Sequence, residues 1–218
     1  MNYVIIDSGN SRSFPARHSL LDGQSADGEV VIVIGTGQTE VLEKIAGRET
    51  KAAILVELGT ESLGVYTGES RGTEGSNLLG FARFRLGDGE PSNLIELVRQ
   101  PNTQETVIDV AKRVLEGAGF KVAVCFDFQG RIIDRLVRPY YNAALRRLDE
   151  GLASADDMDL TLRLGLGYPE GPIALLERTG LEHHFDVTQD LFKALGETPY
   201  APARRARVAK ARAQNQGI

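Results

Sequence analysis

The chain has 218 residues and a formal net charge of -5 at pH 7; 42% of its residues are hydrophobic and 25% are charged. This composition is ordinary for a globular protein of one large or two small domains, and the negative charge gives general nucleic-acid binding no electrostatic support. The sequence contains no apolar run near the roughly 20 residues that span a bilayer, and its start, MNYVIIDSGN, lacks the basic and long apolar segments of a signal peptide.

The first third of the chain predicts a parallel sheet. Continuous β-branched runs such as EVVIVI (29–34) are typical of strands buried on both faces. A short helical segment separates this run from the next, and a strand, helix and strand in this order form a parallel crossover unit. The expected elements are strands at 2–6, 29–34 and 52–56, a polar loop at 10–28 and a short helix at 39–46.

The turn Gly35-Thr36-Gly37-Gln38-Thr39-Glu40 follows a strand and opens a helix, as a dinucleotide-binding fingerprint does. Its first two glycines are present, and Glu57 ends the next strand at a distance suited to a ribose contact. The third glycine is replaced by Glu40, whose carboxylate would face a pyrophosphate. Two interpretations remain: a nicotinamide dinucleotide (NAD) site, or a plain turn made of small residues.

The middle of the chain predicts a helix followed by a strand. Thr103 is the expected cap of the helix, which stops near Gly117. Cys125 is the only cysteine; it cannot form an internal disulfide, so we expect a reducing, cytoplasmic location and a small packed side chain rather than a nucleophile. The expected strand covers 121–125 and is the last before the helical part of the chain, and a domain boundary is expected near 123–127.

The last third predicts helices. An apolar stripe at three- and four-residue spacing predicts a long helix ended by Gly151, and Ser154 with two following acids caps a second. Pro172 suits the first position of a third helix. The stripe comprises Ile132, Ile133, Leu136, Val137, Tyr140, Ala144, Leu145 and Leu148; further helical segments are 173–178, 181–195 and a basic one at 199–212. His183 and His184 are adjacent and point to different helix sides, so we expect surface or packing roles rather than a metal pair.

These residues carry a resemblance. The segment Asp127 to Arg135 (DFQGRIIDR) is similar to the D-x-P-G-F-I-x-N-R pattern of the 3-hydroxyacyl-CoA dehydrogenases, and Gly165 to Pro172 matches their G-x-G-x-P-x-G-P turn. The first of these segments, Asp127 to Arg135, departs from the family pattern at Gln129, Arg131 and Asp134. The resemblance extends over about residues 54–192 and implies an α/β domain at 1–124, a reduced Rossmann-like parallel sheet with most of its cofactor half missing, and an all-α domain at 125–218.

The resemblance also assigns residues. Oxidation of a 3-hydroxyacyl thioester needs a base, a carboxylate that orients it, and a nicotinamide that accepts hydride. The family's histidine falls on Ala82, its glutamate on Glu96, and its asparagine on Asp134. Its two substrate-binding serines fall on Glu61 and Ser62. Glu96 and Asp134 are therefore the candidate catalytic positions, and Glu61 and Ser62 the candidate substrate-binding ones.

Loss of the histidine leaves three carboxylates, Glu61, Glu96 and Asp134, that we expect to converge. Carboxylates at such short distances repel each other unless a cation or water offsets their charge. Arg83 or Arg135 could supply that cation. The alternative is a new acid/base or Mg²⁺/Mn²⁺ site.

The functional expectation follows from the resemblance. It implies NAD-linked oxidation of a short 3-hydroxyacyl-CoA such as 3-hydroxybutyryl-CoA, with weak or absent activity because the base and the dinucleotide fingerprint are lost. NAD is implied by the family but not expected to bind this chain. The alternative is a non-catalytic acyl-CoA-binding module that forms a homodimer through its helical domain or docks onto an intact dehydrogenase.

Overall fold

The computed structural model describes residues 2–216 and divides into two compact units. The first unit comprises residues 2–85 and 91–131. The second comprises residues 86–90 and 132–216. The sequence placed the boundary between residues 124 and 125, whereas the division into units falls after Arg131 and assigns the short loop 86–90 to the helical unit.

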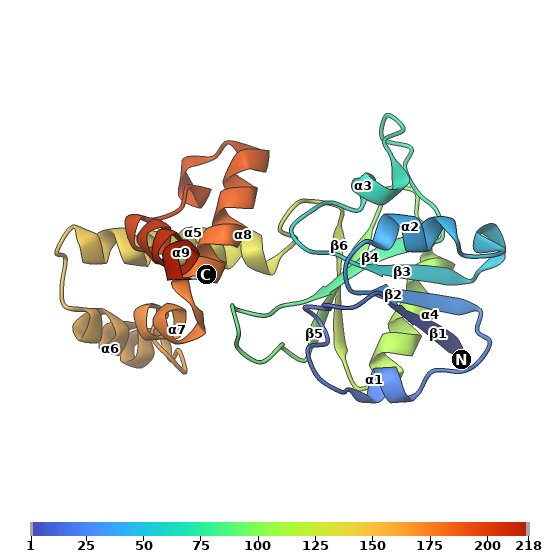
Figure 1. The fold of residues 1–218 in the computed structure, drawn as a ribbon, viewed down its shortest axis with the longest axis horizontal. Coiled ribbons are helices and arrows are strands. Elements are labelled where there is room, and N and C mark those ends of the chain that lie inside the picture. Colours follow the sequence, from blue (N-terminus) through green and yellow to red (C-terminus); the bar gives the residue numbers. More distant parts are fainter. Residues whose placement is uncertain (1, 217–218) are drawn as a thin grey trace. The chain divides into compact units, whose positions relative to one another are not determined.

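Within the described residues, the first unit contains one six-stranded sheet, in the order β1 to β6 along the chain (Figure 1). Neighbouring strands are parallel except β4 and β5, which run antiparallel. The bounds are β1 Tyr3–Asp7, β2 Val30–Ile34, β3 Ala53–Glu57, β4 Leu78–Arg83, β5 Leu94–Arg99 and β6 Lys121–Phe126. The prediction of a largely parallel sheet is confirmed.

Each face of the sheet packs against its own apolar layer. One layer joins alternate strand residues to Leu20 of α1 (Ser19–Asp22) and to the apolar side of α4 (Glu105–Gly117). The other joins the intervening strand residues to Leu42 of α2 (Gln38–Glu43) and Leu63, next to α3 (Gly64–Thr67). Because β2 and β3 are buried at every position, their continuous apolar runs are explained by helices on both sides.

Two short helices were missed. The segment 10–28 was expected to be a loop, but it contains α1, whose first turn is capped by the His18 ring: Nδ1 accepts the Leu20 N–H at 3.1 Å. The α3 helix is capped by Asp127, whose carboxylate accepts the N–H groups of Leu63 (2.6 Å) and Gly64 (2.8 Å). Both caps come from residues that no local capping pattern points to.

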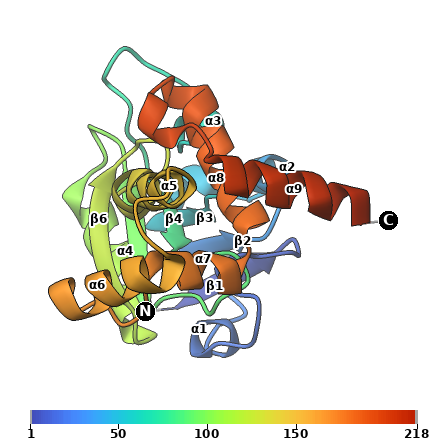
Figure 2. The same cartoon turned by 90° about the vertical axis from the view of Figure 1, so that its left-hand side faces the viewer.

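The second unit is helical, as predicted (Figure 2). Its elements are α5 Ile133–Asp149, α6 Ala155–Leu166, α7 Pro172–Thr179, α8 Leu181–Leu195, a 3₁₀ turn at Thr198–Tyr200 and α9 Arg204–Gln216. Ser154 caps α6 by accepting the Asp157 N–H at 3.1 Å, and Pro172 occupies the first turn of α7. The glycine-rich turn is closed by Asp159, which accepts the N–H groups of Ile173 and Ala174.

The buried side of α5 differs from the predicted stripe. Ala144 and Leu145 are buried as expected, but Ile132 and Leu136 are 38% and 69% exposed. Polar residues Asp134, Arg138 and Asn142 are buried instead. Apolar spacing misplaced this face because a hydrogen-bonded polar network, described below, occupies the interior of the unit.

No helix within residues 2–216 combines the length and the apolar character that crossing a membrane requires.

Candidate functional site

Strand register places the two central family positions opposite each other. In the antiparallel β4–β5 pair, Ala82 lies directly across from Glu96, and on the other side of β5 Glu96 lies across from Ala123. Directly opposed residues share a face, with Cβ atoms about 5 Å apart. The position that the resemblance assigns to histidine therefore faces Glu96, but it carries only a methyl group.

A buried cation, Arg131, meets Glu96. Arg131 Nε lies 3.3 Å from Glu96 Oε2, and the two residues are 7% and 2% exposed. The sequence analysis considered Arg83 and Arg135 as cations; Arg83 instead donates to the carbonyl oxygens of Ser13 and Ser92. Arg131 was missed because its side chain is positioned by a turn, not by helix or strand periodicity.

Arg131 has a left-handed backbone, with φ of 49°, directly after Gly130 with φ of 78°. Its N–H donates to the Phe128 carbonyl at 2.9 Å, which closes the turn between β6 and α5. Positive φ is uncommon for a residue with a side chain. The strained turn directs the guanidinium onto the β5 carboxylate.

Cys125 belongs to the same cluster. Burial first, and the Glu96 charge second, raise the pKa of the Cys125 thiol to about 11, although the Arg131 charge opposes the rise. The thiol stays protonated at neutral pH and packs against an apolar layer of the sheet. The structure agrees with the expectation of a packed cysteine rather than a nucleophile.

Glu61 and Ser62 lie in the turn between β3 and α3. Glu61 Oε1 accepts the N–H of Gly59 at 3.0 Å and the hydroxyl of Tyr66 at 3.1 Å. Ser62 contributes its carbonyl oxygen to the Val65 N–H at 3.3 Å. Burial, assisted by the Glu61 charge, raises the pKa of Tyr66, so its hydroxyl remains a donor. Glu61 is thus held within its own turn.

Asp134 belongs to a buried chain of polar side chains in the helical unit. Arg138 Nε donates to Asp134 Oδ1 at 2.7 Å, and Arg138 Nη1 lies 3.1 Å from His184 Nδ1. A guanidinium only donates, so Nδ1 accepts and the imidazole proton lies on Nε2, 3.0 Å from Asn142 Oδ1. Asn142 Nδ2 in turn donates to the Pro199 carbonyl at 3.0 Å.

The protonation state of His184 follows from this arrangement. Burial and, second, the Arg138 charge lower the pKa of His184 to about 3. The packing role expected for this histidine is confirmed. His183 lies 3.1 Å from Asp88 and is half-buried.

Each of the three carboxylates has a partner. Glu61 accepts from a tyrosine, Glu96 pairs with Arg131, and Asp134 pairs with Arg138. Among residues 2–216, no group of three or more histidine, cysteine, aspartate or glutamate side chains is arranged to hold a metal ion. The metal alternative therefore has no support from the geometry.

The contacts of the Gly35 turn do not suit a pyrophosphate. The Gly35 N–H donates to Glu57 Oε2 at 2.8 Å, and the Thr36 N–H donates to the Gly9 carbonyl at 3.0 Å. A Cβ on Gly35 would overlap the Gly9 carbonyl, so the glycine allows two loops to pack together. Glu57 is 3% exposed and also accepts the Ser13 N–H at 2.7 Å. Glu57, considered above as a ribose ligand, is turned inward, and its negative charge takes the N–H groups that a phosphate would need.

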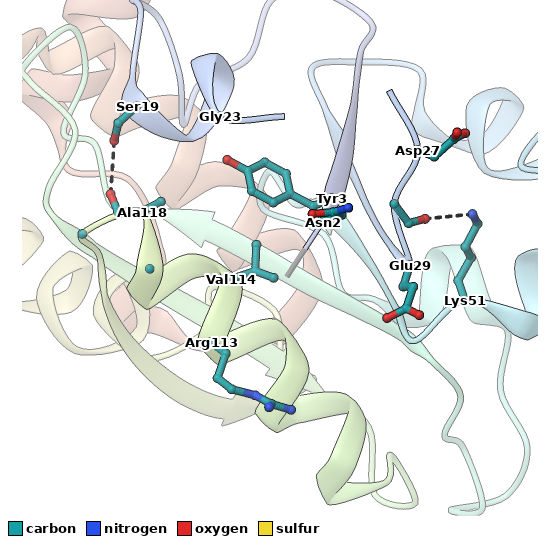
Figure 3. Close-up of a pocket in the computed structure, with 13 residues that line it drawn as sticks. Asn2, Tyr3, Ser19, Gly23, Asp27, Glu29, Lys51, Arg113, Val114 and Ala118 are labelled. Atoms are coloured by element: carbon teal, nitrogen blue, oxygen red, sulfur yellow. Dashed lines mark hydrogen bonds between the residues drawn. The ribbon is translucent and has the colours of Figure 1, made fainter. Parts of the chain in front are cut away.

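A pocket of about 1350 Å³ opens at the amino ends of the parallel strands, beside the first residues of β1, β2 and β3 (Figure 3). Two of its polar side chains already have partners: Lys51 Nζ donates to the Gly28 carbonyl at 3.0 Å, and Ser19 Oγ donates to the Ala118 carbonyl at 3.2 Å. Open α/β sheets bind ligands at the carboxyl ends of their strands, whereas this pocket lies at the amino ends. Geometry therefore favours the Glu96–Arg131 cluster as the candidate site.

The basic helix α9 is partly neutralised within its own unit. Arg204 and Arg205 contact Asp149 at 3.4 and 2.8 Å, and Lys210 contacts Asp186 at 2.8 Å. These pairs agree with the expectation of a solvated helix, and the two acids offset only part of the charge of its five basic residues.

Comparison with known proteins agrees with the resemblance. Residues 130–216 match the profile of the 3-hydroxyacyl-CoA dehydrogenase C-terminal domain. The chain is 31% identical over 109 residues to 3-hydroxybutyryl-CoA dehydrogenase of Bradyrhizobium diazoefficiens, a match covering 50% of this chain and 37% of that protein. It is 33% identical over 109 residues to the mitochondrial hydroxyacyl-coenzyme A dehydrogenase of Sus scrofa, covering 46% and 35%.

A crystal structure of (S)-3-hydroxybutyryl-CoA dehydrogenase from Ralstonia eutropha superposes with a TM-score of 0.71 at 25% identity, over 84% of this chain and 65% of that one. The chain matches only about a third of the length of the curated relatives. The fold and the helical-domain profile nevertheless agree: residues 130–216 match the C-terminal domain of the 3-hydroxyacyl-CoA dehydrogenases, and the chain is similar in fold to members of that family.

Proposed function

We propose that this chain binds an acyl thioester as its family does but does not, by itself, oxidise it. The observation that carries the proposal is the buried Glu96–Arg131 ion pair opposite Ala82. A dehydrogenase base must accept the hydroxyl proton, and a guanidinium stays protonated at any pH at which a protein works. A static ion pair stands where a carboxylate-supported base would act.

The expected loss is large. Removal of a general base typically lowers the rate by about 10²–10⁴-fold. NAD, the oxidant implied by the family, would accept the hydride. The N–H groups of the Gly35 turn, however, already donate to Glu57 and to the Gly9 carbonyl. In this proposal the nicotinamide is supplied by an intact dehydrogenase onto which the chain docks.

The decisive assay is turnover of acetoacetyl-CoA with NADH, followed at 340 nm alongside an intact 3-hydroxybutyryl-CoA dehydrogenase. We expect no rate above background for this chain and no saturable NADH fluorescence. Calorimetry should still detect binding of an acyl-CoA. Turnover within about tenfold of the intact enzyme would refute the proposed loss of chemistry, and absence of acyl-CoA binding would refute the binding function.

The alternative, an assembly module, is supported by helix α6. None of its residues is buried, and Leu160 and Leu164 are 48% and 76% exposed, as is Leu166 at 65%. An apolar face of this kind suits a homodimer or a dehydrogenase partner. Size-exclusion chromatography with light scattering should find a dimer that Leu164→Glu dissociates and that Leu152→Glu, an equally exposed leucine outside α6, leaves intact. A monomeric wild-type chain would refute the homodimer proposal.

We further propose a reducing, cytoplasmic location, supported by the single free cysteine, Cys125. Labelling of the native thiol in cell extract tests this; a mixed disulfide at Cys125 would contradict it.

A further inference from the structure

A second, smaller pocket lies in the first unit, beside the end of α3 and the residue that follows β5. Its volume is about 350 Å³, at the small end of the range for ligand-binding pockets. Neither Glu96 nor Arg131 lines it. Its mouth is formed by exposed residues, among them Ser70, Thr73 and Ser76, so a ligand can enter from solvent.

The buried part of the lining contains an acceptor without a donor. Gln100 is 2% exposed, and its Nε2 donates to Thr67 Oγ1 at 2.7 Å. The Thr67 hydroxyl has an acceptor of its own in the Gly68 carbonyl at 3.3 Å, which fixes the orientation of the Gln100 amide. Within residues 2–216, Gln100 Oε1 is buried and has no hydrogen-bond partner. Such an acceptor is costly, and a ligand with an N–H or O–H group would satisfy it.

Two charged side chains line the same pocket, and only one of them is held by the protein. Glu74 Oε1 accepts the N–H groups of Ser70 at 2.5 Å and Gly72 at 3.0 Å, and these bonds lower the pKa of Glu74. Arg48 is half-buried, and its guanidinium makes no hydrogen bond or ion pair in the part of the chain that the structure describes. The pocket therefore presents an unpaired cation, a fixed carboxylate and an unpaired acceptor.

We propose that this pocket binds a small zwitterion, a free α-amino acid, with its carboxylate on Arg48 and its ammonium group on Gln100 Oε1. An anion without a donor would leave Oε1 unpaired and would meet the Glu74 carboxylate. A neutral sugar would leave the Arg48 charge without a counter-ion. A zwitterion adds no net charge, and each of its charged groups finds a group of opposite polarity in the lining.

The lining also indicates which amino acids fit. It is rich in hydroxyl groups, which favour a short polar side chain over an apolar one: Tyr66, Thr67, Ser70, Thr73 and Ser76. L-Serine is therefore the probe. The site lies away from the Glu96–Arg131 cluster, so this inference does not depend on the proposed acyl-thioester binding.

Three compounds that differ in one group test the assignment. L-Serine carries both charges, L-glycerate has a hydroxyl in place of the ammonium group, and L-serinamide has an uncharged amide in place of the carboxylate. Titration calorimetry at pH 7 should show serine binding about tenfold or more tightly than either of the others, because each lacks one charge-assisted hydrogen bond. In ¹⁵N-labelled protein, serine should also shift the side-chain amide resonances of Gln100.

Substitutions then locate the ligand. Arg48→Met and Gln100→Met should each weaken serine binding about tenfold or more. Arg113→Met is the matched control, since it removes an arginine that lines the larger pocket, and it should leave serine binding unchanged. If Gln100→Met does not fold, the half-buried Arg48→Met and the ligand order of the wild-type protein decide the question.

The contrary outcomes are distinct. Absence of serine binding, or equal binding of serine and glycerate, overturns the zwitterion site. Serine binding that survives in Arg48→Met, or that Arg113→Met weakens, places the ligand elsewhere and overturns it as well. None of these results bears on acyl-CoA binding, which is measured separately.

Discussion

His184 should make the protein sensitive to mild acid. Its folded pKa of about 3 lies below the unfolded value of about 6.5. Between these values the unfolded chain binds a proton that the folded chain refuses, because a proton on Nδ1 would face the Arg138 guanidinium at 3.1 Å. Stability is therefore complete above pH 6.5, falls as the pH drops through 6.5, and stops falling from this cause below pH 3.

The magnitude follows from linkage. For one group with these two pKa values, the free energy of unfolding falls by about 2 kcal/mol between pH 7 and pH 5. The figure hardly changes for any folded pKa below about 4, because the loss in this range is set by protonation of the unfolded state. An effect of this size is a large fraction of the stability of a typical domain.

Urea unfolding at pH 7 and pH 5 measures the loss, followed by circular dichroism at 222 nm. His184→Gln should show an acid-induced loss smaller than that of the wild-type protein by about 2 kcal/mol, whatever its stability at pH 7. His183→Gln is the matched control, since its imidazole is half-buried beside Asp88, and it should not reproduce this change. An equal acid-induced loss in the wild-type protein and His184→Gln would refute the reasoning.

Further predictions concern the sheet and the turn of the helical unit. Ala82→His introduces an imidazole opposite Glu96, and its pKa can be measured by NMR titration. This pKa should be higher by about one unit or more in Ala82→His/Arg131→Phe, which lacks the competing cation, than in Ala82→His alone. Equal values in the two variants would mean that the introduced ring does not meet the buried glutamate. Glu57→Ala removes the acceptor of the Ser13 and Gly35 N–H groups and should lower the free energy of unfolding by about 1–3 kcal/mol in urea titrations. An unchanged free energy of unfolding would contradict the role of Glu57 as their acceptor. Gly171→Ala drives a methyl group into the carboxylate that caps α7 and should lower thermal stability, whereas Gly165→Ala, with open space around it, should not; equal melting temperatures would be evidence against this packing.

Much of the candidate site could be predicted from the chain alone. Continuous β-branched runs predicted the buried strands, and the family resemblance assigned Ala82 and Glu96 to one site; the register then placed them opposite each other. These predictions succeed because strand burial and pairing depend on local residue pattern and on order along the chain. The loss of an ionisable base is likewise a matter of residue identity.

The partners of the buried charges were decided by the tertiary structure. Arg131 reaches Glu96 across 35 positions through a left-handed turn, and His184 reaches Arg138 across 46 positions through packed helices. Neither pair has a periodic signature, and the apolar stripe of α5 even pointed away from the buried Asp134 and Arg138. A residue's type states which charge it can carry, but only the packed fold determines which opposite charge it meets, because desolvation forces buried ions to pair with whatever lies within reach.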